Sequence, residues 1–201
     1  MHMPSLETAR LRIRPLTMND IEDVHRLLDV ELREPDVDAA GTEALAERER
    51  WLRWTVLNYD ELASLKQPPY GDRAVVHQRT GELIGLCGLV PSLAPFGQLA
   101  HPGEAAPPPA LYTNEMGLYY AFAPAHRRQG YATEASAALV EFAFEQLRLK
   151  RIVATTTHDN TPSVRVMEKL GMRIARNPHA EPPWFQVAGI LDNLVAATSE
   201  K

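Results

Sequence analysis

The sequence predicts a mixed α/β fold in which helices cover the faces of one sheet. Strand-like and amphipathic helical stretches follow one another in the order β-α-α-β-β-β-α-β-α-β-β, an alternation typical of such sheets. The chain has 201 residues, of which 45% are apolar, enough to build a core, and no internal repeat divides it. We therefore expect a single domain over 1–201.

The first elements are a strand and two helices. Residues 11–16 largely alternate apolar and basic side chains and are expected to form an edge strand. Helices are expected at 21–30 and 42–58, the second with one apolar stripe. Trp51 and Trp54 lie off that stripe, where packing against a neighbouring element is favoured and contact with a bound molecule stays open.

Two further strands, at 74–77 and 83–89, are separated by a short glycine-containing segment that suits a hairpin. Cys87 lies in the second of them among apolar neighbours and without an evident base, so we expect no nucleophilic cysteine. The proline-rich segment 91–109 is expected to be a long inserted loop rather than a domain linker.

The remaining elements follow the proline-rich segment. They are a strand at 111–122, a helix at 130–147, a strand at 151–157, a helix at 163–170, and strands at 172–176 and 185–191. The short helix has marked ends, because Thr161 suits its N-cap, Pro162 its first position and Gly171 the left-handed residue that closes it.

Composition excludes several classes of function. The formal net charge of −5 and the pI near 5.8 provide no basic field for nucleic acid. No apolar run approaches the roughly eighteen residues of a membrane span, and the N-terminus lacks the apolar stretch of a signal peptide. The histidines show no metal-ligand spacing, and the single cysteine cannot form an internal disulfide. We expect a cytoplasmic protein without a metal.

The segment 125–135, AHRRQGYATEA, is the most informative part of the sequence. It joins a strand to a helix, and the first amides of a helix lack intrahelical partners, so that with the helix dipole they form an anion site. Gly130 and Ala132 allow close approach of the anion, while Arg127 and Arg128 add charge. A small polyanion such as a pyrophosphate fits this turn, although a solvated surface turn would use the same residues. Neither the Walker nor the Rossmann glycine pattern occurs.

Two motifs in order carry a resemblance. Residues 127–132, RRQGYA, are similar to the [QR]xxGx[GA] signature of the GNAT acetyltransferases. About thirty residues later, HDNTPS at 158–163 and EKLGM at 168–172 resemble the second coenzyme A element of that family. The opening LETARLRIRPLTMNDIEDV also resembles the branch that contains the ribosomal-protein N-terminal acetyltransferases.

The resemblance implies the GNAT fold and acetyl-coenzyme A as co-substrate, with its pyrophosphate on the backbone amides of 128–133. It also implies that the strand end at 121–123 pairs with the pantetheine arm and that Asn160 hydrogen-bonds the arm from the other side. The alternative for Asn160 is an ordinary turn or cap residue. The residues implied in coenzyme A binding are Ala121, Phe122, Ala123, Arg127, Arg128, Gln129, Gly130, Tyr131, Ala132, Thr133 and Asn160.

Acetyl transfer to an amine needs a base, because an amine that is protonated at neutral pH has no lone pair with which to attack a thioester. Glu115 is the candidate base. The resembling branch carries a glutamate at this place, and Gly117 leaves room for substrate. An exposed strand residue or a salt-bridge partner is an equally compatible role for Glu115.

The general acid is less clear from the sequence. Many members of the resembling family carry a tyrosine where this chain has Met167, which cannot donate a proton. Ser163 is the replacement to test, although serine in a first helical turn is more often a cap. Tyr119 and Tyr120 are further candidates.

The resulting hypothesis is an N-acetyltransferase that moves acetyl directly from acetyl-coenzyme A to an amine. The alternative is a catalytically weak domain of the same fold that senses acyl-coenzyme A or docks to a partner. The acceptor stays open among protein N-termini, polyamines, aminoglycosides and small amino compounds. We expect a monomer or homodimer, with the insertion at 91–109 bordering the acceptor side.

Overall fold

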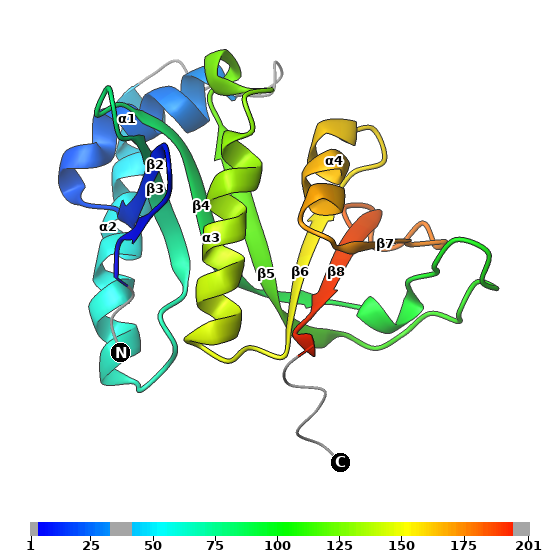
Figure 1. Cartoon of the computed structure of the whole chain (residues 1–201). Helices are drawn as coiled ribbons and strands as arrows, with labels where there is room; N and C mark the ends of the chain where they lie inside the picture. Colours follow the sequence, from blue (N-terminus) through cyan, green and yellow to red (C-terminus); the bar gives the residue numbers. More distant parts are fainter. Residues whose placement is uncertain (1–3, 33–41, 195–201) are drawn as a thin grey trace. The chain divides into compact units, whose positions relative to one another are not determined.

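The computed structural model describes residues 4–32 and 42–194, which belong to two units (Figure 1). The first unit lies within 1–88 and 119–138, and the second within 89–118 and 139–201. The described residues form strands in both units and four α-helices, and the strands of the second unit pair in both parallel and antiparallel fashion, which confirms the predicted α/β class. The single domain over 1–201 stays a prediction, and its ends lie outside the described residues.

In the first unit the strand order is β1-β2-β3-β4. Its elements are β1 (Leu6–Glu7), β2 (Leu11–Pro15), α1 (Ile21–His25), a π-helical stretch (Arg26–Glu31), α2 (Thr42–Ser64), β3 (Gly71–His77), the first part of β4 (Leu83–Ala94), the end of β5 (Thr113–Phe122) and the start of α3 (Tyr131–Glu145). β1 pairs antiparallel with β2, placing Leu6 opposite Ile13. The expectation that 11–16 is an edge strand is therefore wrong, because this short strand covers its outer side.

The core of the first unit gathers side chains from α1, α2 and strands of the same unit. Its buried members are Leu16, Val24, Leu27, Leu52, Ala74, Leu83, Leu86 and Ala123. Leu52 on the predicted stripe of α2 is fully buried, whereas Leu45 near the start of that helix is 41% exposed. Trp51 packs against this cluster, as expected, and Trp54 is 61% exposed.

In the second unit the strands follow the order β5-β6-β8-β7. β6 (Arg151–Thr156) runs parallel to β5, and β8 (Val187–Asp192) is antiparallel to β6. α4 (Thr161–Lys169) contacts β6, β7 (Arg173–Arg176) and β8. Because neighbouring parallel strands need a crossover, the helix predicted between β5 and β6 is a requirement of this topology.

The proline-rich segment 91–109 is not a loop throughout. β4 continues through Pro91 to Ala94, beyond its expected end at residue 89. The amide of Ala100 donates to the carbonyl of Arg176 at 2.8 Å, and a reciprocal bond of 2.9 Å returns. The segment is thus tied to β7, and the prediction of a long loop over all of 91–109 is wrong.

Packing explains why this segment is held in place. The ring of Phe96 meets that of Phe185 edge-on, with centroids 5.3 Å apart. Gln98 is buried and donates to the side chain of Asn177 at 2.9 Å and to the carbonyl of Glu181 at 2.8 Å. A small second core and the buried Gln98–Asn177 amide pair therefore hold part of the segment 91–109, which its proline-rich composition predicts to be a loop.

A partly buried ion pair joins β2 to the start of α1, with the side chain of Arg14 29% exposed. Arg14 donates to both carboxylate oxygens of Asp20, at 2.9 and 2.6 Å, and the Thr17 amide donates to the same group at 2.7 Å. Burial alone would raise the pKa of Asp20, but these hydrogen bonds outweigh it and lower the pKa. The stabilisation is therefore present above the unfolded pKa and is lost as pH falls through the lower folded value.

We expect Asp20→Asn to lower the free energy of unfolding by about 2–4 kcal/mol at neutral pH, because Arg14 would remain without its counter-charge. The deficit should shrink as pH falls below about 4, the pKa of the unfolded carboxyl, and should disappear below the lowered pKa of the folded one. Urea unfolding at a series of pH values measures it. Glu7→Gln, which breaks the exposed pair with Arg12, is the control and should change stability little. A deficit that does not depend on pH would contradict the assignment.

Candidate active site

The predicted anion turn lies in the first unit between β5 and α3. Arg128 and Gly130 both have left-handed backbones, with φ of 61° and 83°. The Glu134 amide donates to the Gly130 carbonyl at 3.0 Å, which opens the helix. The amides of 131–133 precede that bond and have no intrahelical acceptor, so they meet the requirement for an anion site.

Arg10 braces this turn from the N-terminal strand region. Its Nη1 donates to the Gln129 carbonyl at 3.0 Å, and its Nε donates to the Glu134 carboxylate at 2.7 Å. Its guanidinium also lies over the ring of Tyr131, 4.4 Å from the centroid. Thr8 donates a further hydrogen bond of 2.6 Å to Glu134. This contact was not predicted from the sequence, because no common pattern links residues so far apart along the chain.

The side chains of the turn divide into exposed and buried ones. Arg127 and Arg128 are exposed, as counter-charges for an external anion must be, and Arg127 also donates to the Phe122 carbonyl at 3.3 Å. Gln129 donates to the Ala125 carbonyl at 3.1 Å. The ring of Tyr131 is buried and packs edge-on against the ring of His77. Only the backbone amide of Tyr131 is therefore available to bind an anion at this turn.

The strand end implied in holding the pantetheine arm is already partly engaged. The Ala123 amide donates to the Ile84 carbonyl at 3.0 Å. A Cβ added at Gly85 would lie 2.6 Å from the Ala121 carbonyl oxygen and equally close to the Phe122 ring, so β4 approaches this segment very closely. An arm bound here would have to use other backbone groups of 121–123 than the Ala123 amide.

Glu115, in the second unit, forms an ion pair. Its Oε1 lies 3.4 Å from Nη1 of Arg151, whose Nε donates to Asp192 at 2.6 Å. The hydrogen bond that Arg151 donates to Asp192, with the charges of both carboxylates, raises the pKa of Arg151. A Cβ at Gly117 would lie 3.0 Å from the Val90 carbonyl oxygen, so this glycine is needed for strand approach. The sequence left two other roles open for Glu115, an exposed strand residue and a salt-bridge partner, and the structure shows the salt bridge.

Asn160 caps α4. Its side-chain oxygen accepts the Ser163 amide at 3.3 Å, and its carbonyl accepts the same amide at 3.1 Å. The N-cap is thus Asn160, and the prediction of Thr161 is wrong by one position. Both are favourable cap residues, so local preference did not separate them. Ser163 sits in the first turn, where its amide receives the cap.

The candidate acids differ in their surroundings. Met167, which stands at the family's tyrosine position, is fully buried against β8. Burial raises the pKa of Tyr119 to about 12, well above the roughly 8.5 of a thiol, so proton transfer from Tyr119 to a thiolate is unfavourable. Burial likewise raises the pKa of the Cys87 thiol to about 12, which agrees with a packing role.

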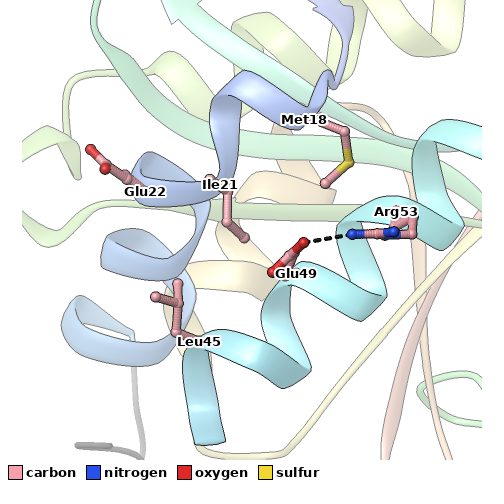
Figure 2. A pocket seen from close by; sticks show the side chains of 6 residues that line it. All are labelled: Met18, Ile21, Glu22, Leu45, Glu49 and Arg53. Atoms are coloured by element: carbon pink, nitrogen blue, oxygen red, sulfur yellow. Dashed lines mark hydrogen bonds and ion pairs between the residues drawn. The ribbon is translucent and has the colours of Figure 1, made fainter. Parts of the chain in front are cut away.

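The first unit also has an open groove of about 640 Å³ between its two early helices (Figure 2). Its lining residues are Met18, Ile21, Glu22, Leu45, Glu49 and Arg53. Glu49 and Arg53 form an ion pair at 2.6 Å across one turn of α2.

In 4–32 and 42–194, no group of three or more His, Cys, Asp or Glu side chains could hold a metal ion. Within the same ranges no helix combines the length and the apolarity needed to cross a membrane.

Comparisons with known proteins agree with these features. A family model described as an acetyltransferase (GNAT) domain matches residues 10–173. The chain is 30% identical to the uncharacterised N-acetyltransferase YoaA of Bacillus subtilis (strain 168) over 171 residues, which cover 85% of this chain and 83% of YoaA. It is 45% identical to YnaD, an uncharacterised N-acetyltransferase of the same strain, over 62 residues, which cover 31% of this chain and 35% of YnaD.

Solved structures share the fold. An acetyltransferase from Agrobacterium tumefaciens str. C58 has a TM-score of 0.65 at 24% identity over 95% of each chain. The spermidine N-acetyltransferase SpeG from Vibrio cholerae has a TM-score of 0.59 at 16% identity, and the match covers 96% of this chain and 100% of SpeG. RimL, a ribosomal L7/L12 alpha-N-protein acetyltransferase in complex with coenzyme A, has a TM-score of 0.63 at 11% identity. The match covers 93% of this chain and 96% of RimL.

The cap at Asn160 can be separated from any role in binding. We expect Asn160→Ala to lower the free energy of unfolding by about 1 kcal/mol, because the Ser163 amide loses its side-chain acceptor. Asn160→Asp should keep wild-type stability, since aspartate caps as well as asparagine. Thermal unfolding of both variants measures this. Equal stability of all three proteins would show that the cap contributes nothing.

Proposed function

Because the chain belongs to the GNAT acetyltransferase family, we propose that it transfers acetyl from acetyl-coenzyme A directly to a primary amine. The observation that carries the proposal is the braced turn before α3, with three unpartnered helix amides, a left-handed Gly130 and two exposed arginines. The family's co-substrate is acetyl-coenzyme A, and its pyrophosphate is the anion that this turn would hold.

The fit of the turn to a pyrophosphate rests on charge as well as on shape. The Glu134 carboxylate lies near the start of α3, where it would repel an anion, but Arg10 is ion-paired with it at 2.6 Å. The pair leaves the helix dipole and the amides of 131–133 to act on the ligand. Arg127 and Arg128 add the positive charge that a pyrophosphate needs.

We expect Gly130→Val to weaken coenzyme A binding at least about tenfold, roughly 1.4 kcal/mol, because a branched side chain would obstruct the anion and strain the turn. Isothermal titration calorimetry measures it. Gly103→Val is the matched control, since Gly103 has nearly the same φ, 85° against 83°, and lies away from the turn in sequence. Unchanged affinity in a folded Gly130→Val protein would remove the turn from the site.

Asn160 would serve two functions at once, capping α4 with its oxygen and donating its amide N–H to the pantetheine arm. Asn160→Asp keeps the oxygen and loses the N–H. In this variant a loss of coenzyme A affinity without loss of stability supports the second function, and unchanged affinity leaves Asn160 as a cap alone.

The chemical step needs one base and one proton donor. A base takes a proton from the ammonium, the free amine attacks the thioester carbonyl, and the carbon–sulfur bond breaks. The nitrogen loses a second proton to give the amide, and the leaving thiolate gains one to give the thiol. Glu115 is the proposed base. Its ion pair with Arg151 would have to yield to the substrate amine, and because Arg151 is also bonded to Asp192, that arginine keeps a partner when this happens.

We expect Glu115→Gln to preserve coenzyme A binding and to reduce turnover by a factor of roughly one hundred to ten thousand. The loss should shrink as pH rises toward the pKa of the amine, because free amine no longer needs a base. Initial rates of thiol release over a pH series measure this. A reduction by the same factor at every pH would indicate positioning, and a wild-type rate would exclude Glu115 as the base.

The acceptor class stays open between protein N-termini and small-molecule amines. Among proteins of the same fold, one is named for a ribosomal protein N-terminus and another for spermidine. Thiol release with a panel of peptides and small amines distinguishes the two classes. Ser163 as proton donor, the cytoplasmic location and a monomeric or homodimeric state also stay predictions.

A further inference from the structure

A second cavity of the first unit lies beside the C-terminal half of α2, at the end of β2 and the start of β3. Its volume is about 280 Å³. Its walls are mostly aliphatic and aromatic, and two of its members are charged. The lining residues are Pro15, Val56, Tyr59, Asp60, Leu62, Pro69, Tyr70 and Arg73.

Arg73 is the unusual member of this lining. It is only 1% exposed, and neither its Nε nor its Nη1 meets a hydrogen-bond partner among the described residues. Burial lowers its pKa to about 10, so the guanidinium is still charged at neutral pH. A buried charge without a counter-ion is strongly destabilising, which makes its retention in a cavity wall informative.

The neighbours of Arg73 do not compensate this charge. Its guanidinium carbon lies 5.6 Å from the centroid of the Tyr59 ring, a weak cation–π contact. The Tyr59 hydroxyl donates its one proton to the Asp72 carbonyl and accepts the Leu16 amide at 3.1 Å, so it is fully engaged. Asp60 is exposed, and no ion pair joins Arg73 to a carboxylate in the described part of the chain.

We propose that this cavity binds a small monocarboxylate. The carboxylate would accept a hydrogen bond from Nη2 of Arg73, the guanidinium nitrogen that is not among the enclosed, unpartnered ones, and would supply the missing counter-charge. The apolar body would lie against Val56, Leu62 and the tyrosine rings. A single negative charge fits better than a dianion, because Asp60 also lines the cavity. The apolar walls offer nothing to inorganic phosphate. This site is independent of the acetyl transfer proposed above, and its test measures binding only.

The test uses the full chain with benzoate as the probe and benzamide as its neutral isostere. In wild-type protein, about 10 mM benzoate should raise the thermal midpoint by at least about 2 °C, and benzamide should not. Arg73→Met should abolish the benzoate shift and weaken affinity at least about tenfold in calorimetry. Arg53→Met, which removes the same charge from the exposed groove between α1 and α2, should keep the full shift.

The ligand-free proteins supply a second readout. Arg73→Met should have a thermal midpoint equal to or above that of wild type, because it removes an unpaired buried charge and keeps a side chain of similar length. If this variant does not fold, Val56→Phe decides instead, since it fills the cavity, leaves Arg73 in place and should also abolish the shift.

Four results would overturn the proposal. One is the absence of a shift with both benzoate and its aliphatic counterpart cyclohexanecarboxylate. Another is an equal response to benzamide, which would show that the charge of the ligand does not matter. The third is a benzoate shift that survives in the variants that should lose it. The last is stabilisation by inorganic phosphate in place of the carboxylates, which would assign the cavity to another class of anion.

Discussion

The carboxylate of Glu134 holds the start of α3 to the N-terminal strand region, and the geometry of the anion turn depends on that contact. Arg10 reaches both sides of Gly130, bonding the Gln129 carbonyl before it and Glu134 after it. A left-handed glycine adopts many conformations in an unconstrained chain. Fixed between these two bonds, it presents the helix amides in one arrangement without requiring a ligand to order them.

The same contact decides the charge that an anion would meet. Near a helix N-terminus a carboxylate is favourable for the helix and unfavourable for a bound phosphate. The hydrogen bonds from Thr8 and Arg10 outweigh the effect of burial and lower the pKa of Glu134, so it remains ionised and paired. The negative charge of Glu134, which stabilises the helix, is therefore neutralised by Arg10. Arg127 and Arg128 stay exposed and available to an anion from solvent.

In the second unit a carboxylate has a structural partner and a proposed chemical role. Arg151 lies closer to Asp192, at 2.6 Å, than to Glu115, at 3.4 Å. The longer contact is the weaker of the two, and losing it leaves the arginine paired. Such an arrangement holds Glu115 in position while keeping the cost of releasing it small.

The sequence by itself determined what is local. The mixed α/β order, the turn before α3 and the short helix follow from hydrophobic periodicity and from residues that fix their own backbone, such as Gly130 and Pro162. That helix was predicted at 163–170 and begins two residues earlier, at Thr161. The N-cap was missed by one position because Asn160 and Thr161 have similar local preference.

Tertiary structure decided the features that join distant residues. The brace of Arg10 on Glu134, the partner of Glu115, the extension of β4 through Pro91 and the unpaired burial of Arg73 are of this kind. Each depends on which side chains meet across the fold and on how much water remains between them. No spacing along the chain encodes either quantity, so these contacts became visible only when the strands and helices were packed together.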